Sequence, residues 1–373
     1  MSDDVLVVNV GSSSVKLQVV DTGGARAFSS ELPTPVDPMA LDELIAGLGP
    51  VRAVGHRVVH GGPDHVEPEL VTDELLAELD DVARLAPLHD PPALAVVRLV
   101  RRLHPELPAV VCFDTAFHAT LPPAARHYAV PARWEDELGI RRYGFHGLNH
   151  RYVAHRAAEL LGREVEDLKL VTCHLGAGAS LTAVDGGRSV DTTMGFTPLS
   201  GLVMATRSGE VDPGAVLWLL REARLDPAEI EDQLWHHSGL AGLSGRSGDL
   251  REVLAGADDG DERCRLALDV YVHRLRSGIA SMVAALGGLD AVVFTGGVGE
   301  RSARIRAVAV AGLSFLGLSV DVAANDALDG GSAAGGSGDG DVTGPGADVA
   351  TLVVAAREDL EIARQVRELI GWR

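Results

Sequence analysis

Two similar strand–turn–strand patterns lie far apart in this chain, and this repetition constrains the fold more than any other feature. Val5–Asp21 reads VLVVNVGSSSVKLQVVD: an apolar run, a turn of small residues and a second β-branched run. Leu168–Gly187 repeats the arrangement as LKLVTCHLGAGASLTAVDGG, with His174 in the place of Asn9. Each pattern predicts two strands joined by a tight turn. We therefore expect a duplicated architecture whose two halves enclose a ligand.

Strand and helix signals alternate along the rest of the chain, which predicts an α/β fold with mixed sheets. Strand patterns occupy Ala53–Gly62, Ala109–His118, Asp290–Glu300 and Ala350–Ala355. Helical patterns occupy 90–104, His146–Gly162, Arg263–Leu286, 302–313 and Asp359–Ile370. Asp90 followed by Pro91 predicts the N-cap and first residue of the first of these helices. Asp329–Asp348 is almost free of large side chains and predicts a flexible surface loop.

Length and charge narrow the class of protein. A chain of 373 residues is about twice what one hydrophobic core supports, so two domains are expected. The net charge of −20 disfavours a nucleic-acid surface, although a few focused cations would still bind a small anion. No apolar run approaches the roughly 18 residues of a membrane span, and the acidic Met1–Asp4 start predicts no secretory signal. Cys112, Cys173 and Cys264, without any CxxC, predict reduced thiols in a cytoplasmic protein.

Polar residues at strand ends and turns are the candidates for chemistry. The Gly11–Ser14 turn with Lys16 is a candidate phosphate cradle, the alternative being a hairpin that merely turns. Arg57 before a Gly-Gly turn is suited to gripping a carboxylate, the alternative being a surface ion pair. Asp114 at a strand end is suited to orienting Mg²⁺ or a nucleophile, or to capping the strand.

Two glycine-rich segments add further candidates. His146, between an aromatic residue and a glycine, is hard to explain by packing, and the long polar segment Asp191–Gly214 contains Arg207. FTGGVGE at Phe294–Glu300 predicts a strand–turn–helix junction whose N–H groups face a nucleotide. The sequence has no HExxH, paired CxxC or GxSxG motif, which disfavours metalloprotease, zinc and triad chemistry.

Taken together, these segments resemble the acetate kinase family over nearly the whole chain. NVGSSSVK, GHRVVHGG, FDTAFHATLP, RRYGFHGLNH, CHLGAGAS, DTTMGFTPLSGLVMATRSG, SGDLR and FTGGVGE occur in the family's order. The resemblance implies two ribonuclease-H-like domains of the actin and sugar-kinase type, with a nucleotide and substrate cleft between them. It implies an N-terminal domain of residues 1–148 plus 357–373, a nucleotide-binding domain of residues 149–356 containing the Gly-rich loop 329–348, and a homodimer.

The resemblance also implies roles for individual residues. The implied catalytic residues are Asp114, His146 and Arg207. The implied substrate-binding residues are Arg57, Val59, Leu88, His89, Phe145 and Pro198. The implied nucleotide-binding residues are Ser12, Ser14, Lys16, His174, Leu175, Gly176, Ala177, Gly178, Asp249, Leu250, Arg251, Gly296, Gly297, Val298, Gly299 and Glu300. Asn9 and Glu358 are implied for the metal, which is Mg²⁺ with Mn²⁺ as an alternative.

The implied reaction is a reversible, in-line phosphoryl transfer from ATP to acetate that gives acetyl phosphate and ADP. Three positions depart from the family pattern: Ala177 and Arg301 each stand for an Asn, and Ala356-Arg357 for Thr-Asn. All three positions belong to the part of the site that binds the phosphate donor, so pyrophosphate remains an alternative donor to ATP. A propionate or other short-chain acyl kinase is the nearest alternative enzyme. A nucleotide-binding regulatory ATPase on the same scaffold is the alternative from another class.

Overall fold

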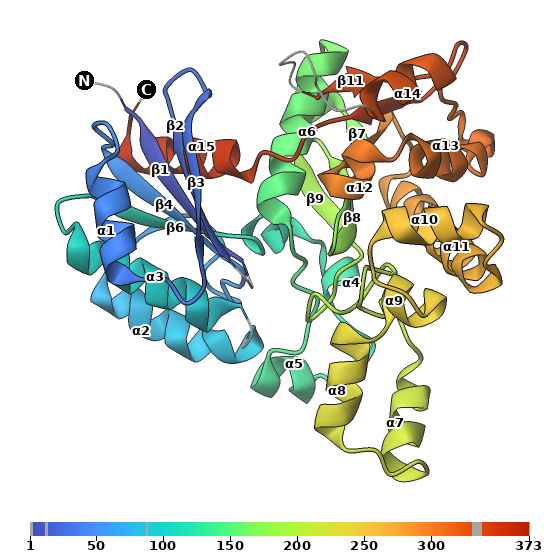
Figure 1. Ribbon diagram of the computed structural model, residues 1–373, viewed down its shortest axis with the longest axis horizontal. Coiled ribbons are helices and arrows are strands. Elements are labelled where there is room, and N and C mark those ends of the chain that lie inside the picture. Colours follow the sequence, from blue (N-terminus) through green and yellow to red (C-terminus); the bar gives the residue numbers. More distant parts are fainter. Residues whose placement is uncertain (1–2, 12–13, 87–88, 330–337, 373) are drawn as a thin grey trace. The chain divides into compact units, whose positions relative to one another are not determined.

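The computed structural model describes residues 3–11, 14–86, 89–329 and 338–372 (Figure 1). It divides into two compact units. Unit 1 comprises Met1–Ala119, Phe145–Tyr152 and Arg357–Arg373, and unit 2 comprises Thr120–Gly144 and Val153–Ala356.

Residues 120–144 group with unit 2, whereas the sequence placed them in the first domain. Arg142 explains this grouping, because its guanidinium donates to the carbonyls of Thr192, Thr193 and Met194 at 2.8, 3.2 and 3.1 Å. These bonds hold the segment on unit 2.

Unit 1 is built on a six-stranded sheet in the order β3-β2-β1-β4-β6-β5. Its strands are β1 (Val5–Val10), β2 (Ser14–Val20), β3 (Arg26–Pro33), β4 (Ala53–Val58), β5 (Glu69–Leu70) and β6 (Ala109–Phe113). Its helices are α1 (Pro38–Ala46), α2 (Asp73–Val82), α3 (Asp90–Leu103) and α15 (Glu358–Ile370). Successive side chains of β1 alternate between two cores, since Leu6 and Val8 pack with Val96 of α3 while Val5 and Val7 pack with Ile362 of α15. Both faces of the sheet are therefore covered by helices, as Figure 1 shows.

Unit 2 repeats this topology. Its sheet has the order β11-β12-β10-β7-β8-β9, formed by β7 (Lys169–Leu175), β8 (Ala179–Asp185), β9 (Arg188–Thr192), β10 (Ala291–Thr295), β11 (Gly340–Asp341) and β12 (Ala350–Val353). In each unit the hairpin and the following strand are antiparallel, two parallel strands come next, and a short antiparallel strand closes the edge. The duplication predicted from the two hairpins is confirmed.

The remaining helices include the predicted segments at 146–162, 263–286 and 302–313 and the predicted glycine turn at 296, together with others for which no helix was predicted. They are α4 (Pro123–Arg126), α5 (Arg133–Leu138), α6 (Gly147–Leu161), α7 (Pro213–Arg221), α8 (Pro227–His236), α9 (Gly239–Ser244), α10 (Leu250–Asp258), α11 (Glu262–Leu286), α12 (Gly296–Arg301), α13 (Ala303–Ala311) and α14 (Val322–Asp329). The prediction of Asp90 as the N-cap of α3 is wrong: His89 is the N-cap, and the Asp90 side chain bonds another segment.

The flexible loop predicted over Asp329–Asp348 is wrong for the part that the structure describes, residues 329 and 338–348; residues 330–337 lie outside it. Asp329 ends α14, Gly340–Asp341 pair with β12, and Val342 is fully buried. One apolar side chain with a strand partner is enough to order this short segment against the sheet.

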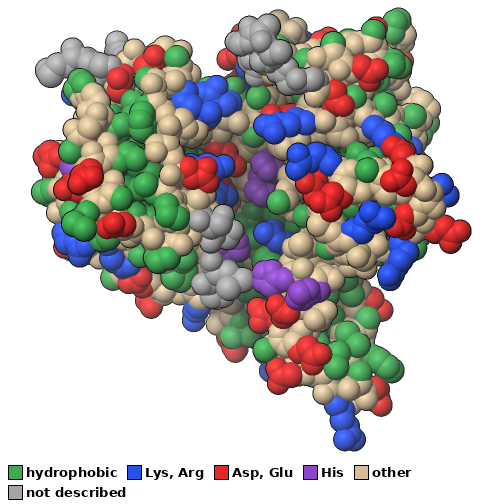
Figure 2. All heavy atoms as spheres, in the orientation of Figure 1, with side chains coloured by type: hydrophobic (Ala, Val, Ile, Leu, Met, Phe, Trp, Pro, Cys, Tyr) green, Lys and Arg blue, Asp and Glu red, His purple; other side chains and the backbone are tan. Residues whose placement is uncertain are grey.

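On the face that Figure 2 shows, Lys and Arg side chains are interspersed with Asp and Glu. Cys112, Cys173 and Cys264 are buried free thiols. In the described ranges, no helix has both the length and the apolar composition needed to cross a membrane.

Candidate active site

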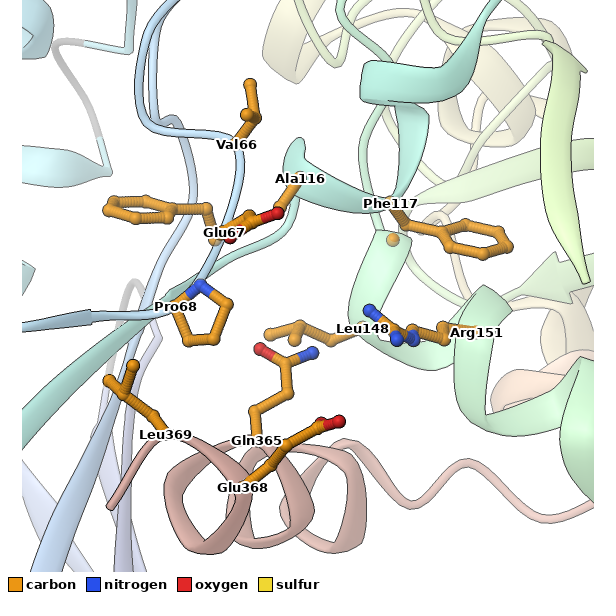
Figure 3. A pocket seen from close by; sticks show the side chains of 12 residues that line it. Val66, Glu67, Pro68, Ala116, Phe117, Leu148, Arg151, Gln365, Glu368 and Leu369 are labelled. Atoms are coloured by element: carbon orange, nitrogen blue, oxygen red, sulfur yellow. The ribbon is translucent and has the colours of Figure 1, made fainter. Parts of the chain in front are cut away.

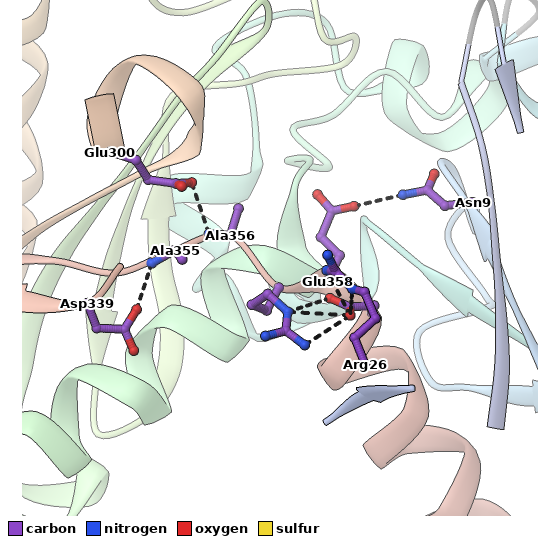
Figure 4. A network of polar contacts seen from close by, with 9 residues as sticks. Asn9, Arg26, Glu300, Asp339, Ala355, Ala356 and Glu358 are labelled. Carbon is purple, nitrogen blue, oxygen red and sulfur yellow. Dashed lines mark hydrogen bonds and ion pairs between the residues drawn. The ribbon is translucent and has the colours of Figure 1, made fainter. Parts of the chain in front are cut away.

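Arg57, at the end of β4, is the centre of a polar cluster in unit 1. Its Nη2 forms an ion pair with Asp114 Oδ2, its Nη1 donates to Asn9 Oδ1 at 3.2 Å, and its Nε lies 3.6 Å from Glu358 Oε2. Asn9 Nδ2 in turn donates to Glu358 Oε2 at 3.1 Å (Figure 4). The four side chains come from β1, β4, the end of β6 and the first turn of α15. β1, β4 and β6 are parallel neighbours, so their carboxyl ends meet at one edge of the sheet.

Burial makes this cluster electrostatically strong. The side chain of Arg57 is 16% exposed and that of Asp114 is 1% exposed. Burial by itself would lower the pKa of the Arg57 guanidinium, but the negative charges of Asp114 and Glu358 have a larger effect and raise this pKa. Burial also raises the pKa of Asp114, although Arg57 opposes this shift. The cluster therefore presents a permanent cation suited to a carboxylate or a phosphate.

The same cluster offers oxygen ligands for a divalent metal. Asp114 Oδ1 is buried without a partner among the described residues, and Glu358 and Asn9 supply further oxygens. The described residues contain no group of three or more His, Cys, Asp or Glu side chains that would bind a metal alone. Mg²⁺ commonly uses one or two carboxylates and completes its shell with water and substrate phosphates. The residues present fit such an ion.

His146 is held beside Asp114 by the residue that follows it. Gly147 N donates to Asp114 O at 2.9 Å, and a Cβ at Gly147 would lie 2.2 Å from that oxygen. His146 itself has φ of 57°, a left-handed conformation that is rare for residues other than glycine. His118 fixes the preceding residue through a 3.0 Å contact between its Nε2 and Phe145 O. A constrained backbone of this kind is common at functional sites.

The other predicted residues of unit 1 fall into three groups. Val59 and Phe145 are buried, and His89 caps α3. Lys16 pairs with Asn9 across β1 and β2, which places both on one face of the sheet, while Ser14 Oγ donates to Glu31. Ser12 and Leu88 lie outside the described residues.

Unit 2 contains a cavity of about 790 Å³. It brings together seven of the sixteen predicted nucleotide residues, namely Gly176, Ala177, Asp249, Leu250, Arg251, Gly297 and Val298. His174 and Leu175 end β7, Gly178 follows in the turn to β8, and Gly296 and Gly299 lie in α12; none of these five belongs to the cavity wall. Sequence reasoning missed the further lining residues Thr206, Leu240, Tyr271 and Arg304.

Buried contacts fix the α12 wall of this cavity. Gly296 has φ of 77°, and a Cβ there would lie 2.8 Å from Leu175 O, so the strand-to-helix turn requires glycine. The fully buried Arg306 donates to the carbonyls of Gly299 and Glu300 at 2.8 and 2.9 Å. No local sequence signal identifies Arg306 as this support, because its partners include backbone carbonyls and the side chain of Asn325, 19 positions away.

Three arginines line the cavity, and they differ in their pairing. Arg251 pairs with Asp249, and Arg304 pairs with Asp258. Arg301 lines the same wall and has no hydrogen-bond or ion-pair partner within the described ranges. Arg301 follows Gly297 by four positions, so in a helix the two residues lie on the same face. This spacing is the sequence signal that could have placed Arg301 at the cavity.

Arg207 lies in unit 2, within the long polar segment that the sequence singled out. Its Nη1 donates to Pro198 O at 3.3 Å, and its guanidinium carbon is 5.1 Å from the ring centroid of Trp235. Burial lowers the pKa of Arg207, and in the part of the chain that the structure describes no carboxylate pairs with it. Its placement against Arg57 stays a prediction.

The chain passes from unit 2 to unit 1 between Ala356 and Arg357, and hydrogen bonds hold it on both sides of this boundary (Figure 4). In unit 2, the amides of Ala355 and Ala356 donate to Asp339 and Glu300 at 2.9 and 3.0 Å. Glu300, expected at the nucleotide, thus bonds the backbone of this segment. In unit 1, Asp359 accepts hydrogen bonds from Arg357 and from Arg26.

A second cavity, of about 420 Å³, lies in unit 1 and contains none of the predicted site residues (Figure 3). Its labelled walls come from the segment before β5, the turn after β6, the first turns of α6, and α15. Phe113 and Gly147 line it, so it lies behind the backbone that presents Asp114.

The sequence matches the acetokinase family over residues 25–364. The chain belongs to this family. It is 46% identical to the acetate kinase of Gloeobacter violaceus, with 92% of this chain and 83% of that protein covered. It is 45% identical to the acetate kinase of Leifsonia xyli subsp. xyli, with 98% and 99% covered.

Solved structures of this acetokinase fold are similar over almost the full chain. The acetate kinase of Porphyromonas gingivalis has a TM-score of 0.90 at 33% identity, with 99% of this chain and all of that chain covered. The propionate kinase of Francisella tularensis has a TM-score of 0.87 at 34% identity, with 97% and 98% covered. The predicted α/β fold of two similar domains is confirmed.

Proposed function

We propose that this member of the acetokinase family catalyses reversible, Mg²⁺-dependent phosphoryl transfer from ATP to acetate, giving acetyl phosphate and ADP. Family membership supports the reaction class. The observation that carries the proposal is the buried cluster of Arg57 with Asn9, Asp114 and Glu358, which joins a fixed cation to oxygen ligands for a metal.

The chemistry explains why the cluster contains a cation rather than a strong base. Acetate is already ionised at pH 7, so its attack on a phosphoryl group needs no proton removed. Catalysis then consists of bringing two anions together and neutralising charge on the transferred group. Arg57 binds the acid, and the resemblance assigns charge stabilisation to His146 and Arg207. A bound Mg²⁺, held through Asp114, Glu358 and Asn9, supplies further neutralisation of phosphate charge.

A hydroxamate trap with acetate, ATP and Mg²⁺ tests the proposal. Wild-type protein should form acetyl hydroxamate, whereas Arg57→Ala should lose roughly 10²–10³-fold in kcat, as when one charge-stabilising donor is removed. Arg52→Ala is the matched control, because Arg52 forms its ion pair with Asp3 away from the cluster. ATP binding without any acyl phosphate from acetate or propionate would favour the regulatory ATPase instead.

Acid length and donor identity are tested in the same assay. Val59 and Phe145, both buried, support a small acyl pocket, so kcat/KM should fall from acetate to propionate to butyrate. One methylene is worth about 1–3 kcal/mol, so the preference over propionate should be about 10- to 200-fold. The inverse order would make the protein a propionate kinase. Replacing ATP by pyrophosphate tests the donor, and the unit 2 cavity of about 790 Å³ supports a nucleotide.

We further propose a cytoplasmic homodimer. The dimer is supported by α7, none of whose side chains is fully buried and on which Leu217 and Trp218 are 48% and 58% exposed. Trp218→Asp should shift the protein to monomers in light scattering. Phe315→Asp, another exposed aromatic position, is the control and should not. A Trp218→Asp dimer would remove α7 from the interface.

A further inference from the structure

Asp90 is a buried carboxylate that holds the backbone next to the acid-binding cluster. It is the first residue of α3 and is 1% exposed. Its Oδ1 accepts hydrogen bonds from Val59 N at 3.1 Å and His60 N at 3.2 Å. Its Oδ2 is buried and has no partner among the residues that the structure describes. The carboxylate thus faces the turn after β4 instead of capping its own helix.

Other contacts fix the rest of this turn. Gly61 N donates to Thr115 Oγ1 at 3.0 Å, and Gly62 N donates to His60 Nδ1 at 2.8 Å. The His60 ring meets Phe145 edge-on, with 5.7 Å between ring centroids. Every amide from residue 59 to residue 62 therefore has an acceptor, and Asp90 supplies two of the four bonds. Without Asp90, two buried amides would lose their partners.

The turn that Asp90 holds starts two residues after Arg57 and contains Val59. We propose that Asp90 is a positioning residue for the acid-binding side of the site, which sets the backbone of Val59 and His60 and thereby the guanidinium of Arg57. This inference rests on the proposed function, and it adds a residue of α3 to the groups that determine acid binding.

The charge of Asp90 gives a readout that a purely structural role would not give. The charged groups that act on it are Arg57 of β4 and Asp114 at the end of β6; the titratable residues next to it are His60, whose amide it accepts from, and His89, which precedes it in the chain. Burial raises the pKa of Asp90 to about 7, against the lowering effect of its two backbone hydrogen bonds. Ionised Asp90 adds negative charge near Arg57 and opposes a substrate carboxylate, so KM for acetate should rise as pH increases through 7.

The test measures KM for acetate and for ATP separately, in the full-length protein between pH 6 and pH 8.5. Asp90→Ala should lower kcat/KM for acetate about 10- to 100-fold, because positioning is lost, with KM for ATP changed less than about twofold. Asp90→Asn keeps an acceptor and stays neutral, so it should restore most of the acetate affinity and flatten the pH dependence of KM for acetate. Asp37→Ala removes a true N-cap, that of α1, and is the matched control that should leave both KM values unchanged.

Equal changes of both KM values in Asp90→Ala, or the same pH profile in wild type and Asp90→Asn, would overturn the proposal. If Asp90→Ala fails to fold, Asp90→Asn alone decides through its pH profile. A wild-type protein that phosphorylates no acid would refute the proposed function instead. In that case hydrogen exchange still tests the anchor, because the Val59 and His60 amides should exchange faster in Asp90→Ala, which removes their acceptor, than in wild type.

Discussion

Replacing Asp90 by Asn should make the stability of the protein less dependent on pH between pH 5 and pH 8. Burial raises the pKa of Asp90 from 3.8 to about 7, so the folded protein favours the neutral acid. The contribution of protonated Asp90 to the free energy of unfolding is fully present below pH 3.8 and is lost as pH rises through 7. A shift of about three units corresponds to about 4 kcal/mol in total, of which about 2.5 kcal/mol is lost between pH 5 and pH 8.

An amide at this position does not titrate, but it leaves a buried N–H₂ group at the place of Oδ2. That group costs about 1–3 kcal/mol at every pH. The stability of Asp90→Asn relative to wild type should therefore rise by about 2.5 kcal/mol between pH 5 and pH 8.

Urea unfolding of both proteins at pH 5, 6, 7 and 8 measures this difference directly. Asp37→Asn is the control, because Asp37 caps α1 from an exposed position and should show no comparable change with pH. The reasoning is refuted if the difference between wild type and Asp90→Asn is the same at pH 5 and pH 8.

Three further predictions concern the two units separately. Arg207→Ala should lower kcat for acetyl phosphate formation by roughly 10²–10³-fold with little change in stability, and near-normal turnover would exclude a catalytic role. Gly147→Ala places a Cβ 2.2 Å from Asp114 O, so it should displace the carboxylate and reduce kcat at least tenfold or unfold the protein, as activity and circular dichroism would show. Arg301→Ala removes from the unit 2 cavity a cation that has no partner among the described residues, and should raise KM for ATP by about tenfold. Arg304→Ala, whose guanidinium already pairs with a carboxylate, should change KM for ATP less than about twofold. Equal effects of the two arginine variants on KM for ATP would contradict the role of Arg301.

Local sequence patterns were sufficient for the duplication and for the strands and helices that they predicted, whereas α1, α2 and α7–α10 had no predicted counterpart. The apolar runs within Val5–Val10 and Lys169–Leu175 predict strands that are buried on both faces, and the structure places both strands in equivalent positions of two sheets with the same order. The glycine turn at Gly296 is equally readable, since its left-handed backbone excludes most other residues. The motifs that carry the family resemblance lie on these same turns and strand ends.

Side-chain partners could not be read in the same way. Asn9 and Glu358 are hydrogen bonded across 349 positions of sequence, because α15 packs against the sheet that β1 opens. The local pattern predicts Asp90 as an N-cap, whereas in the structure its carboxylate accepts hydrogen bonds from the buried amides of Val59 and His60.

The sequence by itself determined the order of strands and helices, the repeat of one topology and the residue types available for binding anions, since these follow from short-range periodicity and backbone preference. Only the tertiary structure decided which charges meet. The pairing of Arg57 with Asp114, and the lack of any such pair for Arg301 in the described part of the chain, depend on sheet register and burial, which bring distant residues into a medium where an ionic contact is strong.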